Sequence, residues 1–149
     1  MRYREAMAGS HTKSLYDTDF AEWSDRTAEL LRSGRFDEVD MENVAEEIAS
    51  LGKAERKAVR SQLQRLMMHK IKQQIQPERE SKSWSASIAE ARQAILEDLE
   101  DSPSLRLHLQ QNLRKIYHRA VELALIETRL DHAPMPDECP WDLDSLLKA

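Results

Sequence analysis

The sequence predicts an all-α protein: a single-domain bundle of about five mainly antiparallel helices, with a short C-terminal helix or turn packed on it. Two observations lead to this prediction. Between residues 10 and 133 only Gly34, Gly52, Pro77 and Pro103 strongly interrupt regular structure, and they divide the chain into five stretches of helix length. The residues between them are rich in Ala, Leu, Glu, Gln, Arg and Lys, which lose little rotamer freedom in a helix.

Apolar residues recur every three or four positions in the first stretch, which predicts a helix from about Asp17 to Ser33. Its stripe consists of Phe20, Trp23, Thr27, Leu30 and Leu31. Gly34 can adopt the left-handed conformation that ends a helix, and Asp40 offers an N-cap for a second one. The inward stripe of this second helix would be Met41, Val44, Ala45, Ile48 and Leu51.

Gly52 allows two interpretations, because helix-favouring composition resumes directly after it. It either ends the second helix or bends a longer one. The next apolar stripe is Ala58, Val59, Leu63, Leu66, Met67, Ile71 and Ile75. Pro77 is expected to close this third helix near Gln76.

Ser83 is a candidate cap for a fourth helix that ends around Asp101, and Ser102 with Pro103 can start a fifth. The inward faces would be Trp84, Ile88, Ala91, Ile95 and Leu99 in the fourth helix, and Leu105, Leu109, Leu113, Ile116, Ala120, Leu123, Ala124 and Leu130 in the fifth. A final turn or short helix is expected over residues 142–147. Trp141, Leu143 and Leu146 would attach it to the bundle.

Length, charge and cysteine content limit the possible classes of protein. A chain of 149 residues suits one domain, which we place at residues 15–147 after a flexible N-terminus over residues 1–14. The net charge of −5 argues against nucleic acid as a main partner. Cys139 is the only cysteine, no apolar run is long enough to cross a membrane, and the start lacks the apolar core of a secretion signal. A cytoplasmic protein without membrane contact is expected.

Several short motifs follow one another over about residues 15–147. They comprise Leu15, Tyr16, Asp19, Phe20 and Trp23; Leu30, Leu31, Arg32, Gly34, Arg35 and Phe36; Asp40, Glu42 and Asn43; Glu46, Glu47 and Ile48; and His69. Further along come Gln76, Pro77 and Glu78; Ser83 and Trp84; Pro103, Ser104 and Leu105; Tyr117 and Ala120; Glu127, Thr128 and Leu130; and Cys139 and Pro140. In these motifs the chain resembles the bacterial family catalogued as domain of unknown function 29. The resemblance implies a small all-helical bacterial domain and brings no known activity.

One candidate site is a polar set made of Glu46, Glu47, His69 and Glu127. A histidine beside glutamates could act as acid, base or metal ligand. The spacing of Glu127 puts it on the core-facing side of the fifth helix, where a carboxylate must be paired or protonated. No histidine has a glutamate three positions before it, so the di-iron pattern of helical bundles is missing. We expect a structural network rather than a catalytic or metal site, and no cofactor.

The second candidate is a segregation of charge. Residues 17–52 carry eleven acids against three arginines, and the stretch from Lys53 to Lys82 carries nine basic residues against three acids. Arg56, Lys57 and Arg60 in this basic stretch could follow a phosphate backbone. The alternative is that neighbouring antiparallel helices of opposite charge pair with each other, and that the acidic helix repels nucleic acid. The sequence favours this alternative.

The third candidate is an apolar surface for another protein. Met67 and Met68 stand in tandem, and the fifth helix is apolar on almost every side around Val121, Leu125 and Ile126. A closed bundle could equally bury all five residues. The leading hypothesis is therefore a non-enzymatic interaction module that self-associates as a homo-oligomer or binds another protein. A nucleic-acid-binding domain and an enzyme or metal site are the alternatives.

Overall fold

The computed structural model describes residues 14–149. Over these residues the chain forms six α-helices and two short 3-10 helices, with no strand, which confirms the all-α class. The described residues fall into two compact units, a first unit that ends at Ser50 and a second unit that begins at Leu51. The flexible segment expected at residues 1–14 lies, apart from Ser14, outside the described residues.

The first unit contains α1 (Leu15–Thr18), α2 (Phe20–Arg32), the 3-10 helix η1 (Phe36–Glu38) and the start of α3. The sequence predicted one helix here, but the chain breaks at Asp19, whose side chain accepts a hydrogen bond from the Glu22 backbone N–H and caps α2. Gly34 has a φ of 74°, so the expected left-handed residue does follow the end of α2.

An aromatic cluster holds the first unit together. Ring centroids of Tyr16 and Trp23 are 4.8 Å apart, and Phe20 packs against both rings. The Tyr16 hydroxyl donates a 2.5 Å hydrogen bond to Glu47 of α3, and this bond raises the pKa of Tyr16 to about 12. Only Thr27 is buried in the described part of this unit. The first unit therefore has very little apolar interior of its own.

Helix α3 (Met41–Ile75) runs through Gly52 without interruption. The second and third helices expected from the sequence are thus one element, and Gly52 does not end a helix. A Cβ placed on Gly52 would meet the guanidinium of Arg56 at 3.4 Å, which is close to an ordinary van der Waals contact with the end of a flexible side chain. The long helix ends before Pro77 as expected, since proline cannot continue the hydrogen-bond ladder.

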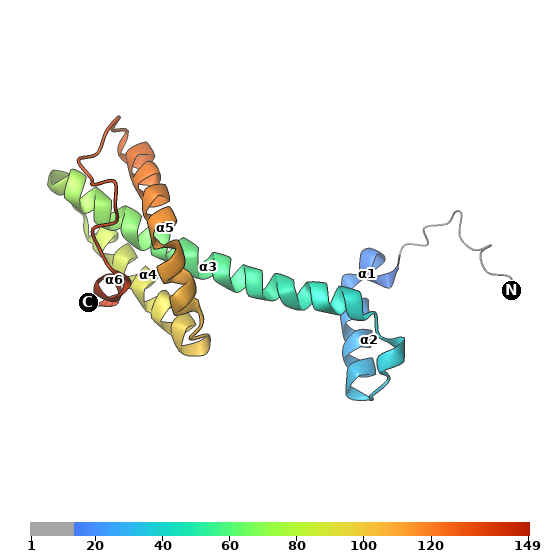
Figure 1. Ribbon diagram of the computed structural model, residues 1–149. Helices are drawn as coiled ribbons and strands as arrows, with labels where there is room; N and C mark the ends of the chain where they lie inside the picture. The colour runs from blue at the N-terminus through green and yellow to red at the C-terminus, as the bar shows by residue number, and fades with distance from the viewer. Residues whose placement is uncertain (1–13) are drawn as a thin grey trace, which may run out of the picture. The chain divides into compact units, whose positions relative to one another are not determined.

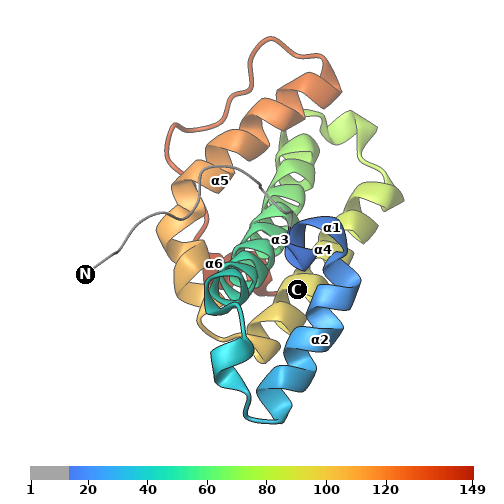
Figure 2. The same cartoon turned by 90° about the vertical axis from the view of Figure 1, so that its right-hand side faces the viewer.

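The second unit is a bundle built from the later turns of α3, α4 (Lys82–Asp101), α5 (Leu105–Thr128) and α6 (Leu143–Leu147), with the 3-10 helix η2 (Pro77–Arg79) after α3. Figure 1 shows α6 next to α4, and the turned view of Figure 2 shows α4 and α5 on either side of the green turns of α3. Its core is one cluster in which Leu63, Ile95 and Leu109 are completely buried. Met67 and Met68 belong to this cluster.

The interaction surface proposed for the tandem methionines is therefore wrong. Both side chains lie on the core-facing side of α3, and Met67 has no exposed surface. Methionine fills irregular gaps between helices because its side chain is unbranched and flexible. In this protein the two adjacent methionines, Met67 and Met68, pack in the core.

The segment after α5 returns along that helix to α6, as Figure 2 shows. The buried Tyr117 of α5 donates a 2.6 Å hydrogen bond to the carbonyl oxygen of Pro136, and a ring nitrogen of His118 lies 2.6 Å from the carbonyl oxygen of Asp137. Asp142 caps α6 through the Ser145 backbone N–H. The predicted C-terminal helix and its attachment by buried leucines are confirmed.

Two helix starts differ from the prediction. The N-cap of α4 is Ser81 and not Ser83, and its hydroxyl accepts a hydrogen bond from the Trp84 backbone N–H. Helix α5 starts at Leu105, so Pro103 lies before the helix instead of at its first position. Several serines stand near both starts, and only the backbone conformation decides which of them caps.

Candidate functional site

The four residues of the predicted polar set are divided between the two units. Glu46 and Glu47 belong to the first unit, where Glu47 accepts the hydrogen bond from Tyr16 and Glu46 is exposed. His69 and Glu127 belong to the second unit. Within each unit the set is therefore reduced to two residues, and Glu47 has a structural partner.

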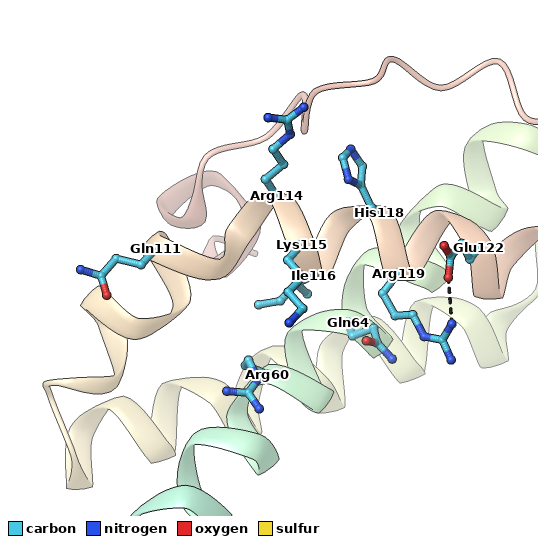
Figure 3. A pocket seen from close by; sticks show the side chains of 9 residues that line it. All are labelled: Arg60, Gln64, Gln111, Arg114, Lys115, Ile116, His118, Arg119 and Glu122. Atoms are coloured by element: carbon cyan, nitrogen blue, oxygen red, sulfur yellow. Dashed lines mark hydrogen bonds and ion pairs between the residues drawn. The ribbon is translucent and has the colours of Figure 1, made fainter.

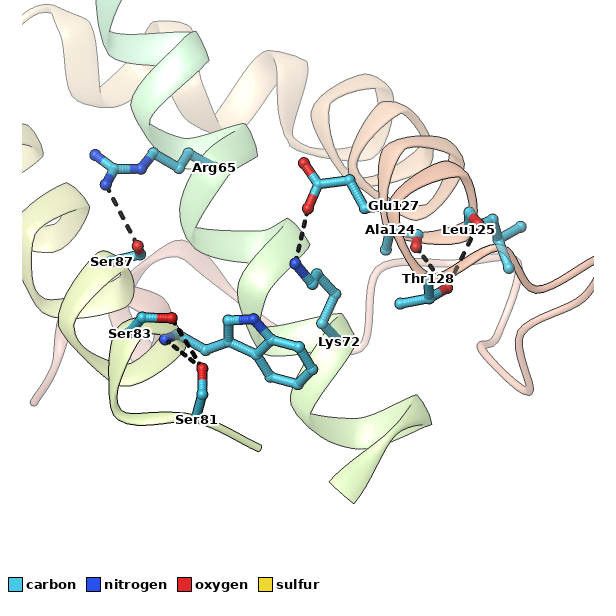
Figure 4. A network of polar contacts seen from close by, with 10 residues as sticks. Arg65, Lys72, Ser81, Ser83, Ser87, Ala124, Leu125, Glu127 and Thr128 are labelled. Carbon is cyan, nitrogen blue, oxygen red and sulfur yellow. Dashed lines mark hydrogen bonds and ion pairs between the residues drawn. The ribbon is translucent and has the colours of Figure 1, made fainter. Parts of the chain in front are cut away.

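Glu127 is paired with Lys72 of α3. The Lys72 ammonium donates a 2.7 Å hydrogen bond to Glu127 (Figure 4). The same ammonium lies 4.7 Å from the centroid of the Trp84 ring. Lys72 is 8% exposed, whereas the Glu127 carboxylate reaches solvent at the edge of the core. The sequence placed Glu127 itself in the core; it is the lysine that is buried. The Glu127 carboxylate and the face of the Trp84 ring stabilise the positive charge of Lys72, whose burial would otherwise cost free energy.

His69 lies beside this pair. Burial lowers the pKa of its imidazole below the usual value, and the positive charge of Lys72 adds to the effect while Glu127 opposes it. The Nδ1 atom of His69 has no hydrogen-bond partner among the described residues. These conditions favour a neutral ring at pH 7, which is able to exchange a proton only at lower pH.

Replacing Glu127 with glutamine tests whether the pair is structural. We expect a loss of about 1 kcal/mol in the free energy of unfolding, because the nearly buried Lys72 then keeps its charge without a carboxylate. Urea unfolding followed by circular dichroism measures it. The control is Glu122→Gln, which breaks an exposed pair with Arg119 and should cost less than about 0.5 kcal/mol. Equal losses in both variants would contradict a structural role for the buried pair.

The basic stretch is partly neutralised by the second unit itself. Arg65 contacts Glu90 at 3.2 Å, and Lys72 is paired as described. Arg65 also lies 3.4 Å from the Ser87 hydroxyl, a contact drawn in Figure 4. Arg60 lies 2.9 Å from a ring nitrogen of His108. Burial lowers the pKa of His108, and the charges of Arg60 and Arg56 lower it further. His108 therefore accepts the hydrogen bond as a neutral ring, and the charge of Arg60 stays uncompensated.

A groove of about 680 Å³ lies between α3 and α5, with Arg60 at one side (Figure 3). Its lining residues are Arg60 and Gln64 of α3, and Gln111, Arg114, Lys115, Ile116, His118, Arg119 and Glu122 of α5. We did not predict the α5 side from the sequence. The signal is nevertheless present, since Lys115 and Arg119 stand four positions apart and therefore lie on one face of α5, with Arg114 and His118 in the adjoining row.

Large apolar side chains are exposed on α3. Met41, Ile48 and Leu51 are 50%, 64% and 67% exposed, although the sequence assigned them to an inward stripe. On α5, Val121 and Leu125 are half-buried and Ile126 is 68% exposed. The apolar excess predicted for α5 is thus mostly covered within the second unit. The larger uncovered row lies on α3.

The described residues include no group of three or more His, Cys, Asp or Glu side chains that could hold a metal ion. Burial raises the pKa of the Cys139 thiol, and a raised pKa disfavours the thiolate form that reactive cysteines need. None of the helices in residues 14–149 combines the length and apolar character needed to cross a membrane.

Comparison with known proteins agrees with the resemblance seen in the sequence motifs. No curated protein and no solved structure matches the chain. The family described as domain of unknown function DUF29 matches residues 15–149, which is most of the chain, and the protein therefore belongs to that family.

Proposed function

We propose that this protein is a non-enzymatic cytoplasmic interaction module that pairs with a second copy of itself through α3. The observation that carries the proposal is the exposed apolar row on this helix. Met41, Ile48 and Leu51 follow one another at spacings of seven and three residues, with the half-buried Val44 between the first two. This is the spacing by which two helices pack along a common seam.

The surroundings of this row suit a close helix pair. The first unit buries only Thr27 among its described residues, so it gains stability from any apolar surface that covers it. Gly52 lies on the same side of α3 by its spacing from Ile48. Glycine weakens a helix interior by about 0.5–1 kcal/mol relative to alanine. Because it has no side chain, it also allows the backbones of two helices to approach closely, which would explain a glycine at this position.

Charge selects an antiparallel arrangement. When Ile48 packs against Leu51 of the second copy, the acidic turns of α3 that carry Glu42 and Glu46 run alongside the basic turns of that copy that carry Lys53 and Lys57. All four charged side chains are exposed on α3. A parallel pair would instead bring glutamates together and lysines together, which is unfavourable.

The experiment is an exchange of charges on the full chain. One variant carries Glu42→Lys and Glu46→Lys, and the other carries Lys53→Glu and Lys57→Glu. Each variant alone should pair at least about tenfold more weakly than the unmodified chain, because turns of like charge then run alongside each other. An equimolar mixture should restore the dimer as a mixed pair. Sedimentation velocity measures both.

Three results would overturn the proposal. The unmodified chain could remain a monomer over the accessible concentration range. The mixture could fail to form mixed dimers although both variants keep their helix content by circular dichroism. Each variant alone could also pair as well as the unmodified chain, which would place the contact away from these turns of α3.

A further inference from the structure

The groove between α3 and α5 carries positive charge that the second unit does not neutralise. Among the described residues, Arg60, Arg114 and Lys115 form no ion pair with a carboxylate. Arg119 has one partner, Glu122, at 2.8 Å. Arg114, Lys115 and Arg119 are exposed on α5, and in Figure 3 Lys115 and Arg119 extend toward α3.

The shape of this surface fits an extended anion with several charges. The lining residues on α5 recur at each turn from Gln111 to Glu122. Eleven residues of α-helix span roughly 16 Å. Cations spread over that length can each meet a separate negative group, whereas a single phosphate could contact only a small part of them.

The lining residues also distinguish between two kinds of polyanion, a single-stranded nucleic acid and an acidic segment of protein. Base stacking on aromatic side chains supplies much of the binding of single-stranded nucleic acid. The groove has no Phe, Tyr or Trp in its lining, and its one ring, His118, lies with a nitrogen 2.6 Å from the carbonyl oxygen of Asp137. Gln64 and Gln111 offer amide groups, and the stems of the long basic side chains offer apolar surface. Carboxylate side chains on a peptide match these groups.

We infer that this groove, which we call the cationic groove, is a docking site for an acidic protein segment that presents several Asp or Glu side chains along its length. The site lies outside the proposed pairing face of α3. If acidic segments did not bind the cationic groove, the proposed self-association through α3 would be unaffected. The two proposals can therefore be tested separately.

The test uses the full-length chain and a fluorescein-labelled decaglutamate peptide. Fluorescence anisotropy should show binding at low salt that weakens steeply as salt is added. The double variant Lys115→Glu with Arg119→Glu should weaken binding about tenfold or more, because both side chains extend from α5 toward α3 and so face the peptide. A labelled oligothymidylate of similar length, measured under the same conditions, should bind more weakly than the peptide.

A second double variant, Arg79→Glu with Lys82→Glu, changes the net charge by the same amount at exposed positions outside the groove. It should bind decaglutamate within about twofold of the unmodified chain. If this control variant lost as much affinity for decaglutamate as the groove variant, net charge alone would explain the binding. That result would overturn the proposed docking site. Absence of peptide binding at low salt, or tighter binding of oligothymidylate, would also overturn it.

Discussion

Replacing Ile48 with glutamate is expected to convert the protein from a dimer to a monomer. In the proposed pair each Ile48 is covered by the other copy, and covering such a side chain stabilises the complex by about 1.5–3 kcal/mol. The variant loses this contribution twice and buries two carboxylates near the seam. The dissociation constant should rise by at least about 100-fold. Sedimentation equilibrium over a range of concentrations measures the change.

Ile126→Glu is the matched control, because Ile126 is 68% exposed and Ile48 is 64% exposed. The two substitutions therefore change the surface by the same chemistry. The Ile126 variant should remain a dimer. If Ile126→Glu dissociates the pair and Ile48→Glu does not, the contact lies on α5, where the sequence first suggested an apolar interaction surface.

Leu109→Ala is expected to destabilise the second unit by about 2–5 kcal/mol. Leu109 is completely buried in the cluster between α3, α4 and α5. Truncation removes apolar contacts and leaves a cavity that the helices can only partly fill. Urea unfolding, followed by far-ultraviolet circular dichroism, gives the difference in the free energy of unfolding.

Leu107→Ala controls for the change of residue type on the same helix. Leu107 is 59% exposed, so its truncation should cost less than about 0.5 kcal/mol. Similar losses at both positions would mean that α5 does not present Leu109 to the core, and would contradict the arrangement of the bundle.

The periodicity of apolar residues predicted the helices well because the buried face of the second unit follows the helical repeat closely. Leu63, Ile95 and Leu109 were all assigned to inward stripes and are all buried. The same rule was wrong for Met41 and Ile48. A stripe records which side of a helix is apolar, and an exposed partner-binding seam has the same period as a core.

Local rules also left Gly52 open, since one glycine lowers helix stability by less than a continuing helix gains from its neighbours. The partners within the polar set could be identified only from the tertiary structure. Charge and spacing indicated that Glu127 needs a partner, but the partner is Lys72, which lies 55 positions away in sequence. The cationic groove was missed because its residues were judged within separate stretches, whereas it combines α3 with one face of α5.

The orientation of two α3 helices in solution tests the central claim most directly. A spin label is attached at Ser50→Cys or at Lys57→Cys, in a chain in which Cys139 is replaced by serine. Both labelled positions are exposed. The proposed pair places Ser50 close to its counterpart and separates the two Lys57 positions by roughly 22 Å along the helix axis. Pulsed electron paramagnetic resonance should report a short distance between copies at position 50 and a distinctly longer one at position 57. Equal distances at both positions, or no coupling between copies, would contradict the account.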